Sequence, residues 1–238
     1  VSGNSGKSNY HFGVGFQSDE GIYRNDDLQR FNLKGAVDTQ INDYLNAGIS
    51  VNAAHTNHST VDNSAISNAF RLNPFCMPYD ENNDIITHPG KAENLGTGSN
   101  QFTSTMNPLL DFENSDYNNR SWQALANFYV QIKPVKDLSL KSTFSPSLYS
   151  TRNAQFEGSN TAARSGGESR AYVQNYTKFS WTWDNQIDYN LKLGDHSVNL
   201  MGLFSASKFN QEKYTQEALG VAEAAKWYNL GQASGTYT

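Results

Sequence analysis

Hydrophobic and polar residues alternate along residues 177–193 with hardly a break, and this pattern indicates one long strand with two different faces. The odd positions are mostly aromatic or aliphatic, and the even positions are all polar or charged. A period of two residues places the two sets on opposite faces of an extended strand. At about 3.3 Å per residue the segment would run roughly 55 Å, far more than a usual soluble strand of about 5–6 residues. The pattern is typical of a transmembrane β-strand, with one face toward lipid and the other toward water.

Six further segments show the same alternation, so the sequence predicts about seven antiparallel strands. The seven are expected near residues 8–17, 28–39, 43–55, 121–133, 137–150, 171–193 and 196–208. Short turns rich in Asn, Asp, Gly and Pro alternate with long connections, the longest of them over residues 56–120. Short turns on one side and long loops on the other are typical of outer-membrane barrels, in which the short side is periplasmic and the long side extracellular.

The two irregular regions contain patterns of their own. Within the long loop the sequence predicts a short helix near Val61–Phe70 and a turn at Asn73–Pro74. The tail over residues 215–231 has a helix-forming composition. The segment 171–193 is longer than a bilayer requires, so its first part, from Ala171 to about Phe179, is expected to project above the membrane.

The number of strands bears on whether the chain is complete as a barrel. An antiparallel barrel closes with an even number of strands, and small ones begin at eight. Open edges in lipid would leave backbone groups without hydrogen bonds, at several kcal/mol each. We therefore interpret residues 1–238 as part of a larger barrel whose remaining strands lie outside this chain.

Composition narrows the class of protein. The mean hydropathy is −0.66, and no apolar run approaches the 18 or so residues of a membrane helix, which excludes a helical membrane protein. The net charge of −5 is interspersed, so no basic stripe for nucleic acid is present. Cys76 is the one cysteine, so no intrachain disulfide can form. The first residues show no signal peptide, which we expect of a mature chain or a piece of a longer one.

The alternating segment 177–193 supplies the candidate site residues. The side chains expected to face lipid or an interfacial girdle are Phe179, Trp181, Trp183, Ile187 and Tyr189, and those expected to face the barrel lumen are Lys178, Asp184, Gln186 and Asp188. The two tryptophans could instead stack against sugars, but they share a face with apolar residues, which favours lipid. The lumen-facing residues could contact a passing substrate or simply form a hydrated wall.

Candidate catalytic and metal motifs are weak, so we expect no enzyme activity and no cofactor. His55 and His58 would need further donors to hold a metal ion. The stretch from Asp80 to Asp84 begins like a calcium loop, but Ile85 replaces the required glycine, which favours a polar turn. Loop aromatics, namely Tyr79, Phe102, Tyr117 and Tyr149, could serve as partner contacts, substrate contacts or loop packing.

Four motifs, in order, resemble the barrel of SusC/RagA-type TonB-dependent transporters. The first is Glu20-Gly21-Ile22 followed by Gln29-Arg30-Phe31, and the second is the turn Asp43-Tyr44-Leu45 with Gly48. The third consists of two loops, NPFCMPYDENNDI (73–85) and NPLLDFEN (107–114), with the strand and turn after them. The fourth is the hairpin containing Asp195, His196 and Asn199. The loop over residues 73–85 lacks the glycine that the family pattern carries. The resemblance extends from Asn9 to about Phe209.

This resemblance implies a barrel of about 22 strands with an N-terminal plug. It also implies import of oligosaccharide or peptide nutrients through the outer membrane of a Gram-negative bacterium, driven by TonB acting on the plug and capped by a SusD-like surface lipoprotein. Neither the plug nor a TonB box is expected within these residues. The main alternative is a soluble β-sandwich that binds glycans or serves in adhesion, since aromatic residues make up 13% of the chain. A passive porin is a lesser alternative.

Overall fold

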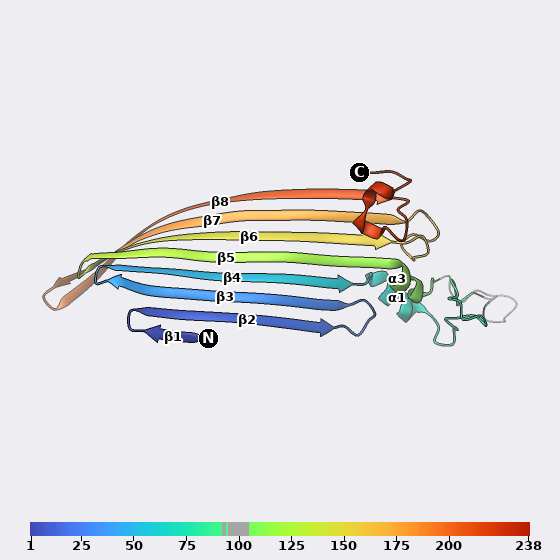
Figure 1. Ribbon diagram of the computed structural model, residues 1–238, viewed down its shortest axis with the longest axis horizontal. Coiled ribbons are helices and arrows are strands. Elements are labelled where there is room, and N and C mark those ends of the chain that lie inside the picture. The colour runs from blue at the N-terminus through green and yellow to red at the C-terminus, as the bar shows by residue number, and fades with distance from the viewer. Residues whose placement is uncertain (92–93, 95–104) are drawn as a thin grey trace.

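The chain folds into one antiparallel sheet of eight strands that follow one another in chain order (Figure 1). A computed structural model describes residues 1–91, 94 and 105–238. The strands are β1 (Ser2–Ser5), β2 (Ser8–Glu20), β3 (Asp27–Asn42), β4 (Leu45–Thr60), β5 (Ser115–Val135), β6 (Leu138–Glu157), β7 (Arg170–Leu193) and β8 (His196–Leu219). The sheet is not closed, since β1 and β8 form its two edges. No second sheet packs on it within the described residues, so the β-sandwich alternative is wrong for this chain.

The connections between strands are sorted by length between the two ends of the sheet. Two-residue turns at 6–7, 43–44, 136–137 and 194–195 lie at one end, which is on the left in Figure 1. Gly6 and Gly194 occupy the left-handed region there, with φ of 55° and 62°, which a tight hairpin requires. The longer connections, over residues 21–26, 61–114 and 158–169, lie at the other end. We call the two ends the turn end and the loop end.

The strands are longer at the loop end than the alternation predicts. β5 begins at Ser115 rather than near 121, β6 continues to Glu157, and β8 continues to Leu219 rather than ending near 208. The short β1 was also missed, because its sequence SGNS has no apolar position to alternate. Toward the loop end the strands carry polar residues on both faces, so the pairing continues where the hydrophobic pattern no longer marks it.

The helices α1 (Asn63–Arg71) and α3 (Pro108–Asn114) lie in the described part of the long β4–β5 connection. α1 forms where the sequence predicts a helix, and Asp62 caps it by accepting a hydrogen bond from the Ser64 amide at 3.0 Å. α3 packs against α1 and is capped by Asn107. The buried Asn107 side chain also donates to the carbonyls of Pro78 and Ile86, at 2.8 and 3.0 Å, which joins α3 to the rest of the loop. None of the described helices has the length and apolar character needed to span a membrane.

The helix-forming composition of residues 215–231 does not produce an α-helix. Residues 215–219 instead extend β8, where Glu217, Ala218 and Leu219 pair with the first residues of β7. Beyond them the chain makes two 3₁₀ turns, η1 (Lys226–Tyr228) and η2 (Leu230–Gln232). The strand ladder and the packing described next outweigh helix propensity, which is worth only some tenths of a kcal/mol per residue.

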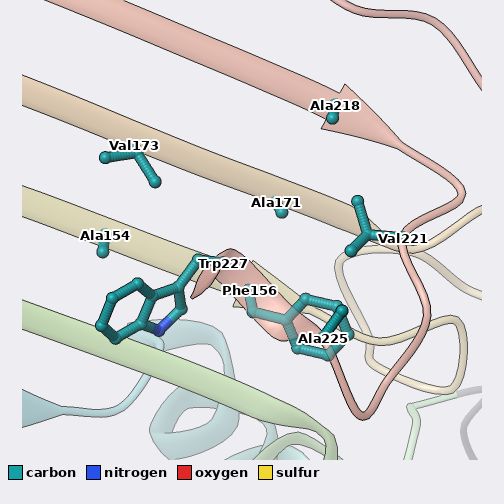
Figure 2. Close-up of a cluster of buried hydrophobic side chains, with 8 residues drawn as sticks. All are labelled: Ala154, Phe156, Ala171, Val173, Ala218, Val221, Ala225 and Trp227. Carbon is teal, nitrogen blue, oxygen red and sulfur yellow. The ribbon is translucent and has the colours of Figure 1, made fainter. Parts of the chain in front are cut away.

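The main hydrophobic core lies at the loop end, where the C-terminal segment (residues 220–238) folds back over one face of β6, β7 and β8. Figure 2 shows Trp227, from η1, lying over that face beside Ala154 and Val173. The buried members of this cluster are Ala154, Phe156, Ala171, Val173, Ala218, Val221, Ala225 and Trp227. Elsewhere the sheet is a single layer.

Candidate transport wall

The pairing of β2 to β8 defines two continuous faces. The register is continuous apart from two irregularities beside the turns, between Gln40 and Asn42 of β3 and between Ile132 and Val135 of β5. Alternate residues therefore stay on one face across all seven strands. Trp183 of β7, for example, pairs with Phe144 of β6 and Ala206 of β8. We call the face that carries the odd residues of β7 the apolar face, and the opposite one the polar face.

The apolar face contains all five residues predicted to face lipid. Phe179, Trp183, Ile187 and Tyr189 are 46%, 44%, 44% and 38% exposed, and Trp181 is half-buried beside Phe144. Large apolar side chains continue this exposed surface over every long strand. They include Tyr10, Phe12, Val14, Phe16, Phe31, Val37, Ile49, Trp122, Phe128, Val130, Ile132, Leu140, Leu148, Val198, Leu200 and Phe204. That this surface contacts lipid stays a prediction.

The exposed apolar surface has a defined height, and we call it the apolar band. On β6 it extends from Leu138 to Leu148, about 33 Å along the strand. With the 35–45° tilt usual in barrels this corresponds to about 25 Å, the usual height of the lipid-facing band. Toward the loop end it finishes in a row of rings from neighbouring strands, Phe16, Phe31, His55 and Trp122, which are successive cross-strand partners. His55 and Trp122 stack with ring centres 4.0 Å apart.

The polar face contains the four residues predicted to face the lumen, but it does not bring all of them together. Gln186 donates to both carboxylate oxygens of Asp188, at 3.0 and 2.9 Å. Lys178 lies over the ring of Phe209, with its Nζ 5.6 Å from the ring centre. Lys178 and Asp184 are six residues apart on one strand, about 20 Å, so they act on different levels of the wall. Contact with substrate stays a prediction for each of the four.

A charged network at the loop end of the polar face was missed by sequence reasoning. Arg170 donates to Glu217 through Nε and Nη2, at 2.8 and 3.1 Å, and its Nη1 lies 3.5 Å from Glu157. Tyr117 donates to Glu157 at 2.9 Å. The network ties four strands together, β5 to β8. No local pattern marks the network, because Tyr117 and Glu157 are 40 residues apart and Arg170 and Glu217 are 47 apart. Glu157 and Arg170 are closer in sequence, but they meet only as cross-strand partners of β6 and β7.

The hydrogen bonds within this network shift the pKa of its members. The bond from Arg170 holds the pKa of Glu217 below its ordinary value of 4.5, and the same bond raises the pKa of Arg170. Burial, together with the negative charge of Glu157, raises the pKa of the Tyr117 phenol far above its ordinary value. Tyr117 therefore stays protonated and remains a hydrogen-bond donor to Glu157.

Aromatic rings lie on the polar face just below this network. Tyr149 and Tyr176 meet edge to face, with centres 6.1 Å apart, and the Tyr176 hydroxyl donates to Gln211 at 3.1 Å. Tyr117 and Tyr149, which we expected in loops, thus lie in β5 and β6. Rings with polar groups beside them can stack against sugar rings or against peptide side chains. Phe102 lies outside the described residues.

The glycine of the turn motif has a structural reason near the turn end. A Cβ on Gly48 would lie 2.3 Å from the ring of Tyr129 and 2.5 Å from a carboxylate oxygen of Asp38. The absent side chain lets Tyr129 lie across the strand and donate to Asp38 at 2.7 Å. Lys141 lies over the same ring at 4.7 Å. The motif therefore fixes one ring on the polar wall.

The loops build a large polar cavity of about 780 Å³ at the loop end. It draws residues from three connections, with Arg24 from 21–26, Tyr79 and Glu113 from 61–114, and Asn160 from 158–169. Asp111 holds two of these connections together, since its Oδ1 accepts a hydrogen bond from the Ala162 amide at 2.7 Å. Burial raises the pKa of this Asp111 carboxyl despite that bond.

Neither candidate metal motif assembles a site. His55 lies on the apolar face, while His58 lies on the polar face and meets Asp26 at 3.1 Å. Asp80 uses one oxygen to accept from the amides of Asn82 and Asp84, at 2.9 and 2.8 Å, which makes this segment a polar turn. In the part of the chain that the structure describes, no group of three or more metal-ligating side chains is found.

Comparison with known proteins gives consistent results. No family model matches the chain. It is 24% identical over 234 residues to TonB-dependent receptor P26 of Formosa agariphila, covering 96% of this chain and 22% of that protein. TonB-dependent receptor P3 of the same organism is also 24% identical, with 89% and 21% covered. This chain therefore spans about a fifth of the length of these relatives.

Solved structures show the same fold. The RagAB peptide transporter matches with a TM-score of 0.69 at 19% identity, over 99% of this chain and 26% of that one. The RagAB peptide importer in its closed-closed state matches with a TM-score of 0.63 at 17% identity, over 92% and 28%. The resemblance to TonB-dependent receptors of this type is confirmed, and so is the fold class, an antiparallel barrel segment that is open within this chain.

Proposed function

We propose that this chain is part of the wall and outer loops of an outer-membrane, TonB-dependent transporter that imports oligosaccharides or peptides, and that it is not an enzyme. The observation that carries the proposal is the contrast between the apolar and polar faces of the sheet. Seven long strands expose an apolar band about 25 Å high on one face and a mostly polar surface on the other. A soluble protein would cover so large an apolar surface with its own chain or with a partner.

The difference in connection length between the two ends of the sheet supports one orientation of the wall in the membrane. The turn end is then periplasmic, and the loop end, with its helices and polar cavity, is extracellular. The two edges of the sheet, on the side of β1 and β2 and at β8, pair with strands outside this chain in the complete barrel, because backbone groups in lipid need partners. The apolar band contacts outer-membrane lipid, and the polar face lines the interior.

The polar face and the loop cavity supply the groups that cargo meets. Cargo enters from the loop end, where amide, carboxylate and phenol groups line the cavity, and passes the rings of Tyr149 and Tyr176. A SusD-like surface lipoprotein covers the loop end. TonB drives release by acting on a plug that lies outside these residues. The name of the RagAB transporter supports peptide as cargo, while stacked rings beside polar groups suit sugars as well.

Uptake by cells tests the proposal. The gene of the complete protein is deleted, and uptake of fluorescent peptides and oligosaccharides of graded size is compared with that of the parent strain and of a strain lacking TonB. We expect one cargo class to lose uptake in both mutants. Uptake that persists without TonB but needs the gene would indicate a passive porin. Recovery of the native protein in buffer without detergent would rule out the membrane wall altogether.

A further inference from the structure

Two arginines lie side by side on the apolar face, one step beyond the ring row that ends the apolar band. Arg120 of β5 and Arg152 of β6 are direct cross-strand partners. Arg120 is two residues from Trp122, so it lies on the same face and nearer the loop end. In the proposed transporter this is the level of the lipid headgroups in the outer leaflet.

These two charges have little to balance them. Within the described residues no carboxylate lies within 4.0 Å of either guanidinium, and the side chain of Arg120 makes no hydrogen bond. Arg152 donates from Nη2 to Asn118 at 3.1 Å, but its Nε is buried and has no partner. Trp227 covers one side of Arg152, with the guanidinium carbon 4.6 Å from the ring centre.

Like charges directly opposite on neighbouring strands repel, and a buried donor without a partner costs free energy as well. An anion between the two guanidiniums would remove the repulsion between them. Planar guanidinium groups match the geometry of phosphate oxygens and bind them through paired hydrogen bonds. The apolar band directly below would accept the acyl chains of a lipid whose phosphate lies at this level.

We infer that Arg120 and Arg152 form a binding site for the phosphate of an outer-leaflet lipid headgroup. The inference rests on the proposed function, because it places the loop end outside and the apolar band in lipid. It goes beyond that function, because it concerns the outer wall and not the path of cargo. The bound lipid would also hold the C-terminal segment in place, through Trp227 and Arg152.

The test uses the complete transporter, purified from outer membranes in detergent and stripped of lipid. Native mass spectrometry then measures the retention of lipid A and of the same lipid with its phosphates removed. The double variant Arg120→Gln/Arg152→Gln keeps much of the side-chain volume but removes both charges. The matched control is Arg30→Gln, which removes a charge at the same level of the sheet from the polar face, since Arg30 pairs with Thr56 and Thr56 with Ser121.

We expect the double variant to bind lipid A at least about tenfold more weakly, since charge-assisted hydrogen bonds are the ones lost. Arg30→Gln should bind as the parent does, and the dephosphorylated lipid should bind weakly to all three. Equal retention by the parent and the double variant would overturn the inference. So would equal retention of the dephosphorylated lipid, or displacement of lipid A by millimolar inorganic phosphate, which would indicate a site for soluble phosphate.

Two further variants keep the test decisive if the double variant folds poorly. Arg120→Gln alone changes an exposed side chain and should weaken binding several-fold, and Arg120→Lys/Arg152→Lys should retain intermediate binding because charge remains. Unchanged binding by Arg120→Gln would contradict the inference. Cargo uptake is measured in parallel, so that loss of lipid binding with normal uptake, or the reverse, separates this site from the proposed function.

Discussion

The apolar face of β7 carries apolar residues on both sides of Asn175 and Thr177, yet the two parts lie in opposite environments. Toward the turn end Phe179 and Trp183 are 46% and 44% exposed, whereas toward the loop end Ala171 and Val173 are 0% and 9% exposed. The register with β6 and β8 is unbroken between them, so the face does not change. What changes is the cover, because the C-terminal segment lies at the loop end of the sheet (Figure 1), where Ala171 and Val173 join the buried cluster (Figure 2).

This difference locates the boundary of the proposed membrane from the protein itself. Where lipid is the surroundings, apolar side chains need no cover from the chain. Where water is the surroundings, exposed apolar area costs about 25 cal/mol per Å², and the chain folds back to bury it. On β7 the boundary falls between Val173 and Phe179. That residues from Ala171 to about Phe179 project above the membrane stays a prediction.

The largest effect is expected from truncating a ring in the covered part. Phe156→Ala should destabilise the loop end by about 3–5 kcal/mol, because Phe156 is 2% exposed and its loss leaves a cavity. The measurement is hydrogen exchange and protease cleavage of residues 220–238 in the complete protein in membranes. Phe144→Ala is the matched control, since Phe144 is on the same strand and face but 42% exposed. Equal loosening of the C-terminal segment by both variants would contradict the comparison.

A second effect is expected from placing a charge on each face of the uncovered part. Ile187→Lys should cost about 1–2 kcal/mol in a bilayer, because the lysine would face lipid within the band but nearer its turn-end edge than its middle. Its neighbour on the polar face provides the control, since Gln186→Lys should change stability by less than about 0.5 kcal/mol. Urea unfolding of the complete protein in lipid vesicles measures both. A similar cost for the two variants would mean that the faces do not differ in environment.

A smaller effect is expected at the charged network, and it depends on pH. Arg170 lowers the pKa of Glu217 in the folded state, so the pair contributes stability above the ordinary value of 4.5 and loses it as pH falls through the lowered value. Glu217→Gln should cost about 1 kcal/mol at pH 7, since Glu217 is one-third exposed. Hydrogen exchange at the ends of β7 and β8 should then lose its acid dependence below 4.5. A variant with the parent's acid response would assign that response to another group.

The smallest effect is expected at the ion pair that joins the C-terminal segment to β5. Lys226 lies 2.9 Å from Asp116, with side chains 40% and 24% exposed. Because solvent and salt screen such a pair, Lys226→Gln should loosen the segment by only about 0.2–1 kcal/mol, and less at high salt. Salt-dependent exchange of residues 220–238 measures it. A cost that matches that of Phe156→Ala would show that charge, not burial, holds the cover.

The sequence by itself determined the sheet, its two faces and the order of its connections. A period of two needs no tertiary information, because it follows from the geometry of a single strand. Gly194 and Asp195 predicted a hairpin from local sequence alone, because these residue types favour a two-residue turn between strands. The motif glycine at position 48 was readable as a pattern, but its purpose, room for Tyr129 beside Asp38, required the structure.

Tertiary structure alone decided what covers the sheet and which distant groups meet. The tail after Gln216 has helix-forming residues, yet pairing with β7 and burial of Trp227 outweighed that local preference. The partners Arg120 and Arg152, and the network of Arg170 with Glu157 and Glu217, depend on the register between long strands. Register is set by the sum of many cross-strand contacts, so no short stretch of sequence contains it. Alternation determines on which face of the sheet each residue lies, but its neighbours on that face are determined only by the register of the folded sheet.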